Sequence, residues 1–149
     1  MTSITIELDG LERVRAALQQ LQEAGSDLSP AFSEIGDRLI ALVKDGFETG
    51  TDPAGRRWAP LKRRKGKPLL DTGTLMRSFI RSASEAGVTV GTATVSAALH
   101  QFGGKAGRNR ATTVPARPML PADALPADWE AEIMLGITRF LSQTIKELS

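Results

Sequence analysis

His100 is the sole histidine of this 149-residue chain and the side chain best suited to acid–base chemistry near neutral pH. A Ser-His-Asp arrangement also needs a nucleophile presented on a tight turn, and no G-x-S-x-G pattern is found. The chain contains no cysteine, which excludes thiolate nucleophiles and disulfides. Metal sites need several His, Cys or closely spaced carboxylates, which the sequence does not offer. We therefore expect a structural histidine, with no catalytic residue, no cofactor and no metal.

A run of basic residues that contains no acid precedes residue 68. Its members are Arg56, Arg57, Lys62, Arg63, Arg64, Lys65 and Lys67. Such a run can bind phosphates by releasing counterions, dock on an acidic protein surface, or remain a solvated loop. Trp58 lies within it and can stack on a base or anchor the loop in an apolar pocket of its own or a neighbouring subunit. The sequence shows no recognisable nucleic-acid-binding fold. We therefore favour Trp58 as an anchor of the loop in an apolar pocket over Trp58 as a residue that stacks on a base.

Charge is divided unevenly along the chain, although the net charge is only +2. Residues 53–122 hold thirteen Lys and Arg against two acids, Asp71 and Glu85, and so carry +11. The flanking segments hold six basic and fifteen acidic residues, a charge of −9. Opposite charges on two parts of one protein favour attraction between copies, although solvated loops without a role can give the same pattern.

Length and composition are typical of one folded domain. With 41% hydrophobic and 24% charged residues, the chain supports a single hydrophobic core and is too apolar for wholesale disorder. We expect one domain over residues 1–149, with extended loops at about 50–70 and 103–120. The N-terminus lacks a signal-peptide pattern, and no apolar run approaches the roughly 20 residues needed to cross a bilayer. We therefore expect a cytoplasmic product with no membrane partner.

The first part of the chain predicts a strand followed by two helices. Alternating apolar residues over Ser3–Leu8 indicate a half-buried strand. Apolar residues at helical spacing over Leu11–Leu21 indicate an amphipathic helix. A longer helix is predicted to begin at Ser29, whose hydroxyl can cap the first turn ahead of Pro30, and to end near Gly50.

The middle of the chain predicts a loop and a small antiparallel sheet. Residues 50–68 show no periodicity and are predicted to form an exposed loop or arm. Asp71 and Thr72 can cap a short helix that continues towards residue 79. Residues 79–84 and 88–92 are two strand-like segments separated by a short turn, and they predict a hairpin.

The last third predicts two helices separated by irregular chain. Val95–Phe102 is predicted to form a short helix, and residues 105–113 are predicted to lack regular structure. Two prolines force residues 114–120 into an extended conformation, and Asp128 is predicted to cap the final helix. The elements together predict an α+β fold, in which a small antiparallel sheet packs with helices. The fold has long polar loops and long helices in the N-terminal half and at the C-terminus.

Four segments occur in the order DPAGRRWAPLK, LLDTGTLMRSF, ALHQFGG and VPARPML and cover the middle half of the chain. Together they resemble the Mu-like phage virion-morphogenesis family, which groups with tail-completion proteins. The resemblance implies a structural virion protein of a tailed phage or prophage that completes the tail and joins it to the head. It implies no catalytic residue and an α+β fold with helices on a small antiparallel sheet.

The resemblance also implies partners and a location. The expected assembly is a ring of identical subunits, with six as the expected number, in the tail or neck of the virion after assembly in the host cytoplasm. Tail-tube, terminator or head-connector proteins are the other expected partners, and a contact with DNA passing through stays open. The expected interface residues are the seven basic residues of the run with Trp58, His100, Gln101, Phe102, Pro115, Arg117 and Pro118.

Two other classes of protein stay open. A basic nucleic-acid-binding accessory protein would explain the basic block, and salt-sensitive DNA binding by the isolated protein would favour it. A toxin-like or hydrolytic enzyme built around His100 is the third class, and full function after His100→Ala would remove it.

Overall fold

The structure is a computed structural model that describes residues 2–6, 16, 19–20, 22–23, 25, 27–62, 66–70, 72–122 and 124–148. Its elements in chain order are β1 (Thr2–Ile6), α2 (Ser29–Thr49), α3 (Thr74–Arg77), β2 (Ile80–Ala83), β3 (Val88–Thr92), α4 (Ala97–Phe102), β4 (Gly104–Ala106), the 3-10 turn η2 (Arg108–Arg110), β5 (Thr112–Val114) and α5 (Ala127–Leu148). This arrangement confirms the α+β prediction. The helix predicted over Leu11–Leu21 falls largely outside the described residues.

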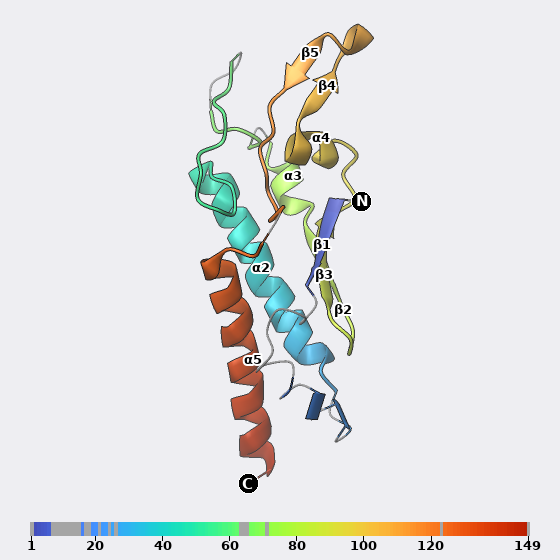
Figure 1. The fold of residues 1–149 in the computed structure, drawn as a ribbon, viewed down its shortest axis with the longest axis vertical. Helices are drawn as coiled ribbons and strands as arrows, with labels where there is room; N and C mark the ends of the chain where they lie inside the picture. The colour runs from blue at the N-terminus through green and yellow to red at the C-terminus, as the bar shows by residue number, and fades with distance from the viewer. Residues whose placement is uncertain are drawn as a thin grey trace.

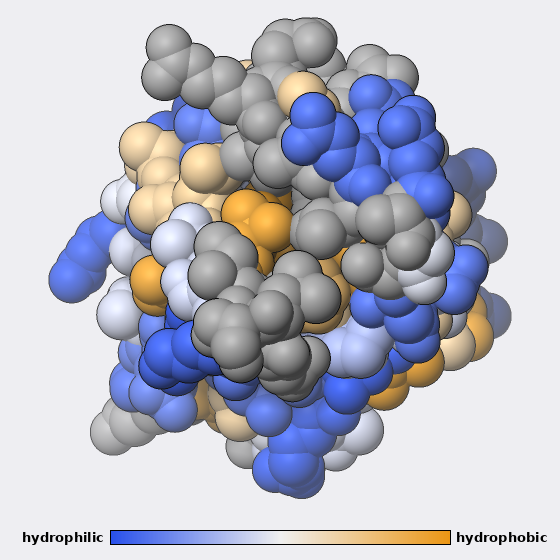
Figure 2. All heavy atoms as spheres, turned by 90° about the horizontal axis from the view of Figure 1, so that it is seen from below, coloured by the Kyte–Doolittle hydropathy of each residue, from blue (hydrophilic) through white to orange (hydrophobic). Residues whose placement is uncertain are grey.

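Helix α2 is the central element of the fold. It runs antiparallel to α5 and lies between that helix and the sheet that contains β3 (Figure 1). Its buried large side chains recur every three or four residues, which places them on one side of a helix. They are Phe32, Ile35, Leu39, Val43 and Phe47. Seen from the lower end, hydrophobic residues gather near the centre and hydrophilic residues surround them (Figure 2).

The two ends of α2 show how local chemistry sets its length. At the start, the Asp27 carboxylate accepts hydrogen bonds from the backbone N–H and the hydroxyl of Ser29, at 2.9 and 2.7 Å, and these bonds lower the pKa of Asp27. The prediction that Ser29 itself caps the helix is therefore wrong, because Ser29 donates to a residue ahead of it. At the other end, Gly50 takes a left-handed conformation with φ 71° and ends the helix as predicted.

A three-stranded antiparallel sheet has the order β1-β3-β2. The hairpin predicted from residues 79–84 and 88–92 is confirmed by β2 and β3, which pair with Ser82 opposite Thr89. Strand β3 is central, and its Val88 and Val90 are buried on the side of the core. The predicted first strand is β1, which pairs with β3 through Ile4 opposite Val90.

The segment predicted to lack regular structure, residues 105–113, forms a second hairpin instead. Strands β4 and β5 pair antiparallel, with Lys105 opposite Thr113, and η2 closes the turn. Gly107 and Asn109 take positive φ values of 80° and 57°, which supply the reversal. Both faces of this hairpin are largely exposed, so the sequence carries no apolar alternation from which to predict it.

Helix α5 packs on α2 through a close approach at one glycine. Its buried residues include Trp129, Ile133 and Ile137, as the sequence predicted, although the helix begins at Ala127, one residue before the predicted cap. A Cβ added at Gly136 would lie 2.7 Å from Cγ1 of Ile35 on α2. The two helices therefore reach their spacing only because position 136 has no side chain.

Gly136→Ala should lower the stability of the subunit. Alanine favours a helix over glycine by about 1 kcal/mol, but forcing a methyl group into a packed contact costs about 1–3 kcal/mol. We expect a net loss of about 1 kcal/mol in the free energy of unfolding, measured by urea denaturation. Thr138→Ala, on the exposed side of the same helix, is the control and should be neutral or slightly stabilising. A Gly136→Ala protein at least as stable as wild type would show that the helices can separate without cost.

Candidate assembly interface

The segments that the sequence singled out meet at the upper end of the molecule. The loop after α2, the helices α3 and α4, the β4–β5 hairpin and the chain that follows it lie together there (Figure 1). Three buried side chains, Trp58, Gln101 and Arg117, hold these segments to one another.

Trp58 is part of the core of its own subunit. It is only 6% exposed and packs edge-on against Phe47 of α2, with ring centroids 5.5 Å apart. Its indole N–H donates to the carbonyl of Pro118 at 2.8 Å. The sequence left open whether Trp58 anchors the loop in its own subunit or in a neighbouring one. In the structure it occupies a pocket of its own subunit. Its side chain is buried and offers no surface to a neighbour in this conformation.

The loop after α2 is tied down more firmly than an exposed arm would be. The N–H of Trp58 donates to the carbonyl of Gly50 at 2.8 Å, and Thr51 and Arg57 form an isolated antiparallel bridge. Asp52 accepts from the backbone and the guanidinium of Arg56, at 2.8 and 3.1 Å. These bonds fix the first half of the loop, while residues 63–65 lie outside the described part.

Arg117 and Gln101 fix the extended segment that contains Pro115 and Pro118. The Arg117 guanidinium donates to the carbonyls of Ala59 and Pro60, at 2.9 and 3.1 Å, so it joins the extended segment to the basic loop. The Gln101 side chain accepts from the N–H groups of Met119 and Leu120 and donates to the Leu120 carbonyl at 2.8 Å. Both side chains are buried, and their role in this structure is to position the backbone of the segment.

His100 is half-buried beside Arg117 at the edge of an open pocket of about 420 Å³. Burial first, and then the positive charge of Arg117, lower the pKa of His100 from its usual 6.5. Its Nδ1 is buried and has no hydrogen-bond partner among the described residues. Within the described residues no carboxylate forms a hydrogen bond to the ring, and the structural role expected for His100 stays a prediction.

The exposed members of the predicted set are the basic side chains and one aromatic. Arg56, Arg57, Lys62 and Lys67 are exposed, and Phe102 is 69% exposed at the end of α4. The hairpin adds the exposed cations Lys105, Arg108 and Arg110, which belong to the basic block but were not predicted as interface residues. Their signal in the sequence was the charge itself, and the fold places all three on one short hairpin.

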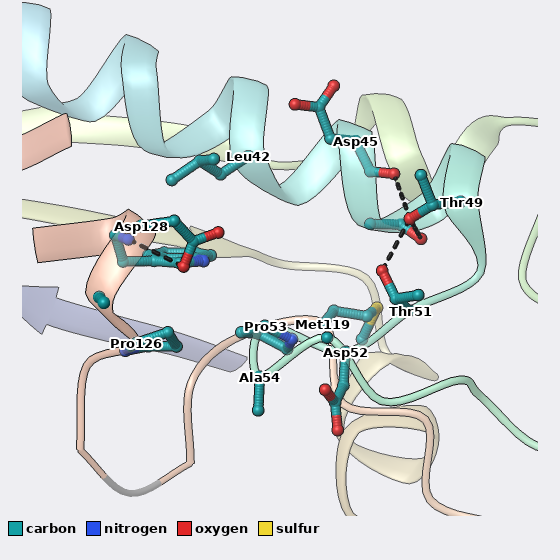
Figure 3. Close-up of a pocket in the computed structure, with 14 residues that line it drawn as sticks. Leu42, Asp45, Thr49, Thr51, Asp52, Pro53, Ala54, Met119, Pro126 and Asp128 are labelled. Atoms are coloured by element: carbon teal, nitrogen blue, oxygen red, sulfur yellow. Dashed lines mark hydrogen bonds between the residues drawn. The ribbon is translucent and has the colours of Figure 1, made fainter. Parts of the chain in front are cut away.

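A pocket of about 440 Å³ opens between the end of α2, the loop after it and the start of α5 (Figure 3). Apolar side chains of Leu42, Met119 and Trp129 line it together with the turn at Pro53. Three acidic residues also belong to its lining, Asp45, Asp52 and Asp128. Asp52 is already paired with Arg56, whereas Asp45 and Asp128 are exposed and form no ion pair within the described residues.

The described residues contain no group of three or more His, Asp or Glu side chains placed to hold a metal ion. Among the same residues, no helix has the length and apolar character needed to cross a membrane.

Comparison with known proteins gives two matches. Residues 9–148 match the phage virion morphogenesis family. The chain is 38% identical over 143 residues to Mu-like prophage FluMu G protein 2 of Haemophilus influenzae, an alignment that covers 96% of this chain and 99% of that protein. No solved structure gives a significant match.

Gln101→Met should destabilise the subunit more than a surface change does. The variant keeps the size of the side chain but leaves two backbone N–H groups and one carbonyl buried without partners. Since each such group costs about 1–3 kcal/mol, we expect the free energy of unfolding to fall by about 3 kcal/mol. Gln143→Met, an exposed position on α5, is the matched control and should change stability by less than about 0.5 kcal/mol. Similar effects at the two positions would mean that the extended segment does not depend on Gln101.

The depressed pKa of His100 should make stability depend on pH. As the pH falls below 6.5, the unfolded chain takes up a proton at His100 before the folded chain does. The free energy of unfolding should therefore decline as the pH is lowered through this window and recover above it. His100→Asn should flatten this part of the curve in urea denaturations at a series of pH values. An unchanged slope in the variant would place the titration elsewhere.

Proposed function

Because this chain belongs to the phage virion morphogenesis family, we propose that it completes the tail of a tailed phage or prophage and helps to join it to the head. In this proposal it is a structural subunit without catalytic activity, located in the tail or neck region of the virion. It forms a closed ring of identical subunits, for which six is the number we expect.

The observation that carries the proposal is the separation of charge over two surfaces of one subunit. The β4–β5 hairpin, at the upper end on the side of α4, carries the exposed cations Lys105, Arg108 and Arg110 (Figure 1). Exposed carboxylates, including Asp45 and Asp128, border the pocket between α2 and α5. A contact between two different surfaces repeats from subunit to subunit and closes into a ring when the rotation permits.

The charges have a limited role in this proposal. Attraction between surface charges speeds and orients association, while buried apolar contacts supply most of the affinity. Assembly should then slow as salt rises, because charges more than roughly 8 Å apart are screened at physiological ionic strength. The remaining exposed surface of the ring is available for tail-tube, terminator or head-connector proteins.

A basic accessory protein that binds nucleic acid is the second candidate function. The exposed cations of the basic loop and the hairpin favour it, since both segments lie at the upper end of the molecule (Figure 1). DNA binding by the isolated protein that weakens steeply with salt would support this alternative. DNA that passes through the proposed ring would contact these cations only if they lined the opening.

A phage deleted for this chain tests the proposed function directly. We expect electron micrographs of its lysates to show filled heads and complete-length tails that are not joined, with the infectious titre reduced to background. Wild-type chain supplied in trans should restore joined particles. Supplying Arg57→Glu together with Lys62→Glu should restore fewer, because the reversed charges oppose orientation while the Asp52–Arg56 pair that holds the loop is kept.

Two outcomes would contradict the proposal. A lysate without capsids would place the chain in head formation, and joined, infectious particles would show that tail completion does not need it.

A further inference from the structure

The outer face of α4 is apolar. Val95, just before the helix, is 98% exposed, and Phe102 at its end is 69% exposed. Ala98 is exposed between them, and Ala98 and Phe102, four positions apart, lie on one side of α4. The buried residues Ala97 and Gln101 lie on a different side of the helix, which packs inward. An exposed aromatic in an apolar surface of this kind is typical of a contact with another molecule.

Cations border this apolar face. The chain passes from Phe102 through two glycines directly into the β4–β5 hairpin, which carries Lys105, Arg108 and Arg110. All three are exposed, and none forms an ion pair with another described residue. The surface is therefore an apolar anchor with a positive border.

The pocket between α2 and α5 has the complementary composition. Its lining includes the apolar residues Leu42, Met119 and Trp129 and the acids Asp45 and Asp128, which form no ion pair within the described residues. Glu48, three residues after Asp45 on α2, is exposed and extends the negative border. A volume of about 440 Å³ has room for an aromatic ring, because pockets of about 300–1,000 Å³ hold drug-sized ligands.

We propose that the outer face of α4 in one copy of the chain docks on this pocket in a second copy, with Phe102 inserted between α2 and α5. The hairpin cations then face Asp45, Glu48 and Asp128 of the second copy. This inference rests on the self-association in the proposed function and names the two surfaces that make it.

The positions of the two surfaces favour a second copy as the occupant. Helix α4 and the hairpin lie on one side of the upper half of the subunit, whereas the start of α5 and the turn after α2 lie on the other (Figure 1). A subunit therefore presents the anchor and the pocket in different directions. Each copy can receive one neighbour and enter another, which is the heterologous geometry of a ring.

Reversed charges test the contact without changes to the core. One variant carries Arg108→Glu and Arg110→Glu, and the other carries Asp45→Lys and Glu48→Lys. Each variant alone should sediment as a monomer at low salt, because its anchor and its pocket then carry the same charge. An equimolar mixture should regain the association of wild type, since each reversed surface meets its complement. A mixture that stays monomeric under conditions where wild type associates, with both variants folded by circular dichroism, overturns the inference.

Single cysteines test the same contact in assembled particles, because the chain contains no cysteine of its own. Subunits with Phe102→Cys are mixed with subunits that carry Ala54→Cys at the pocket and treated with a flexible bismaleimide. We expect a cross-linked dimer that neither variant gives alone. Leu135→Cys replaces Phe102→Cys as the control, because Leu135 is 47% exposed on the outer side of α5. A dimer through Leu135 and none through Phe102 would place the interface on α5 and overturn the docking.

The two proposals fail in different ways. Infectious, joined particles that lack the cross-link through Phe102 overturn the docking and leave the role in tail completion intact. Joined particles formed without this chain overturn the role itself, whatever the cross-links show.

Discussion

The buried face of α2 is the contact on which the rest of the subunit depends. One side of this helix packs against α5, and another packs against β2 and β3, so a single row of side chains belongs to both layers of the core. Residues without side chains allow the layers to approach, since an added Cβ at Gly36 would lie 2.9 Å from Cγ2 of Val88. The end of α2 then positions the loop that follows it, because Trp58 of the loop donates its N–H to the Gly50 carbonyl and packs its ring against Phe47. The upper end of the molecule is therefore built outward from one helix.

Beyond the end of α2, polar contacts replace apolar packing as the means of holding segments in place. Arg117 and Gln101 satisfy backbone groups that would otherwise be buried without partners, and Trp58 adds one further bond. Hydrogen bonds to the backbone specify position more narrowly than hydrophobic contacts, because they require direction as well as proximity. This rigidity gives the loops that surround them a defined shape before any partner arrives, which reduces the entropy lost on docking.

Elements whose buried residues recur at a regular spacing could be predicted from the sequence. Features that depend on backbone atoms distant in the sequence could not. The row from Phe32 to Phe47 and the hairpin of β2 and β3 were predictable because one face of each is buried. Residues 105–113 gave no such signal, since both faces of that hairpin are largely exposed. Gln101 entered the predicted site only through its segment, because its partners at residues 119 and 120 have no side-chain signature. The pocket was not predicted, since three separate segments enclose it.

The acids beside the pocket lie at opposite ends of two helix dipoles: those on α5 lie at its positive end, and those on α2 lie near its negative end. Asp128 and Glu130 lie in the first turn of α5, where the positive end of the helix dipole stabilises them. Asp45 and Glu48 lie close to the negative end of α2, whose last turn has no basic residue. That end of α2 thus retains an electrostatic penalty in the free subunit, which a cation from outside relieves. In the proposed assembly, binding and folding would therefore be thermodynamically linked, and an assembled subunit would resist heat better than the same subunit alone.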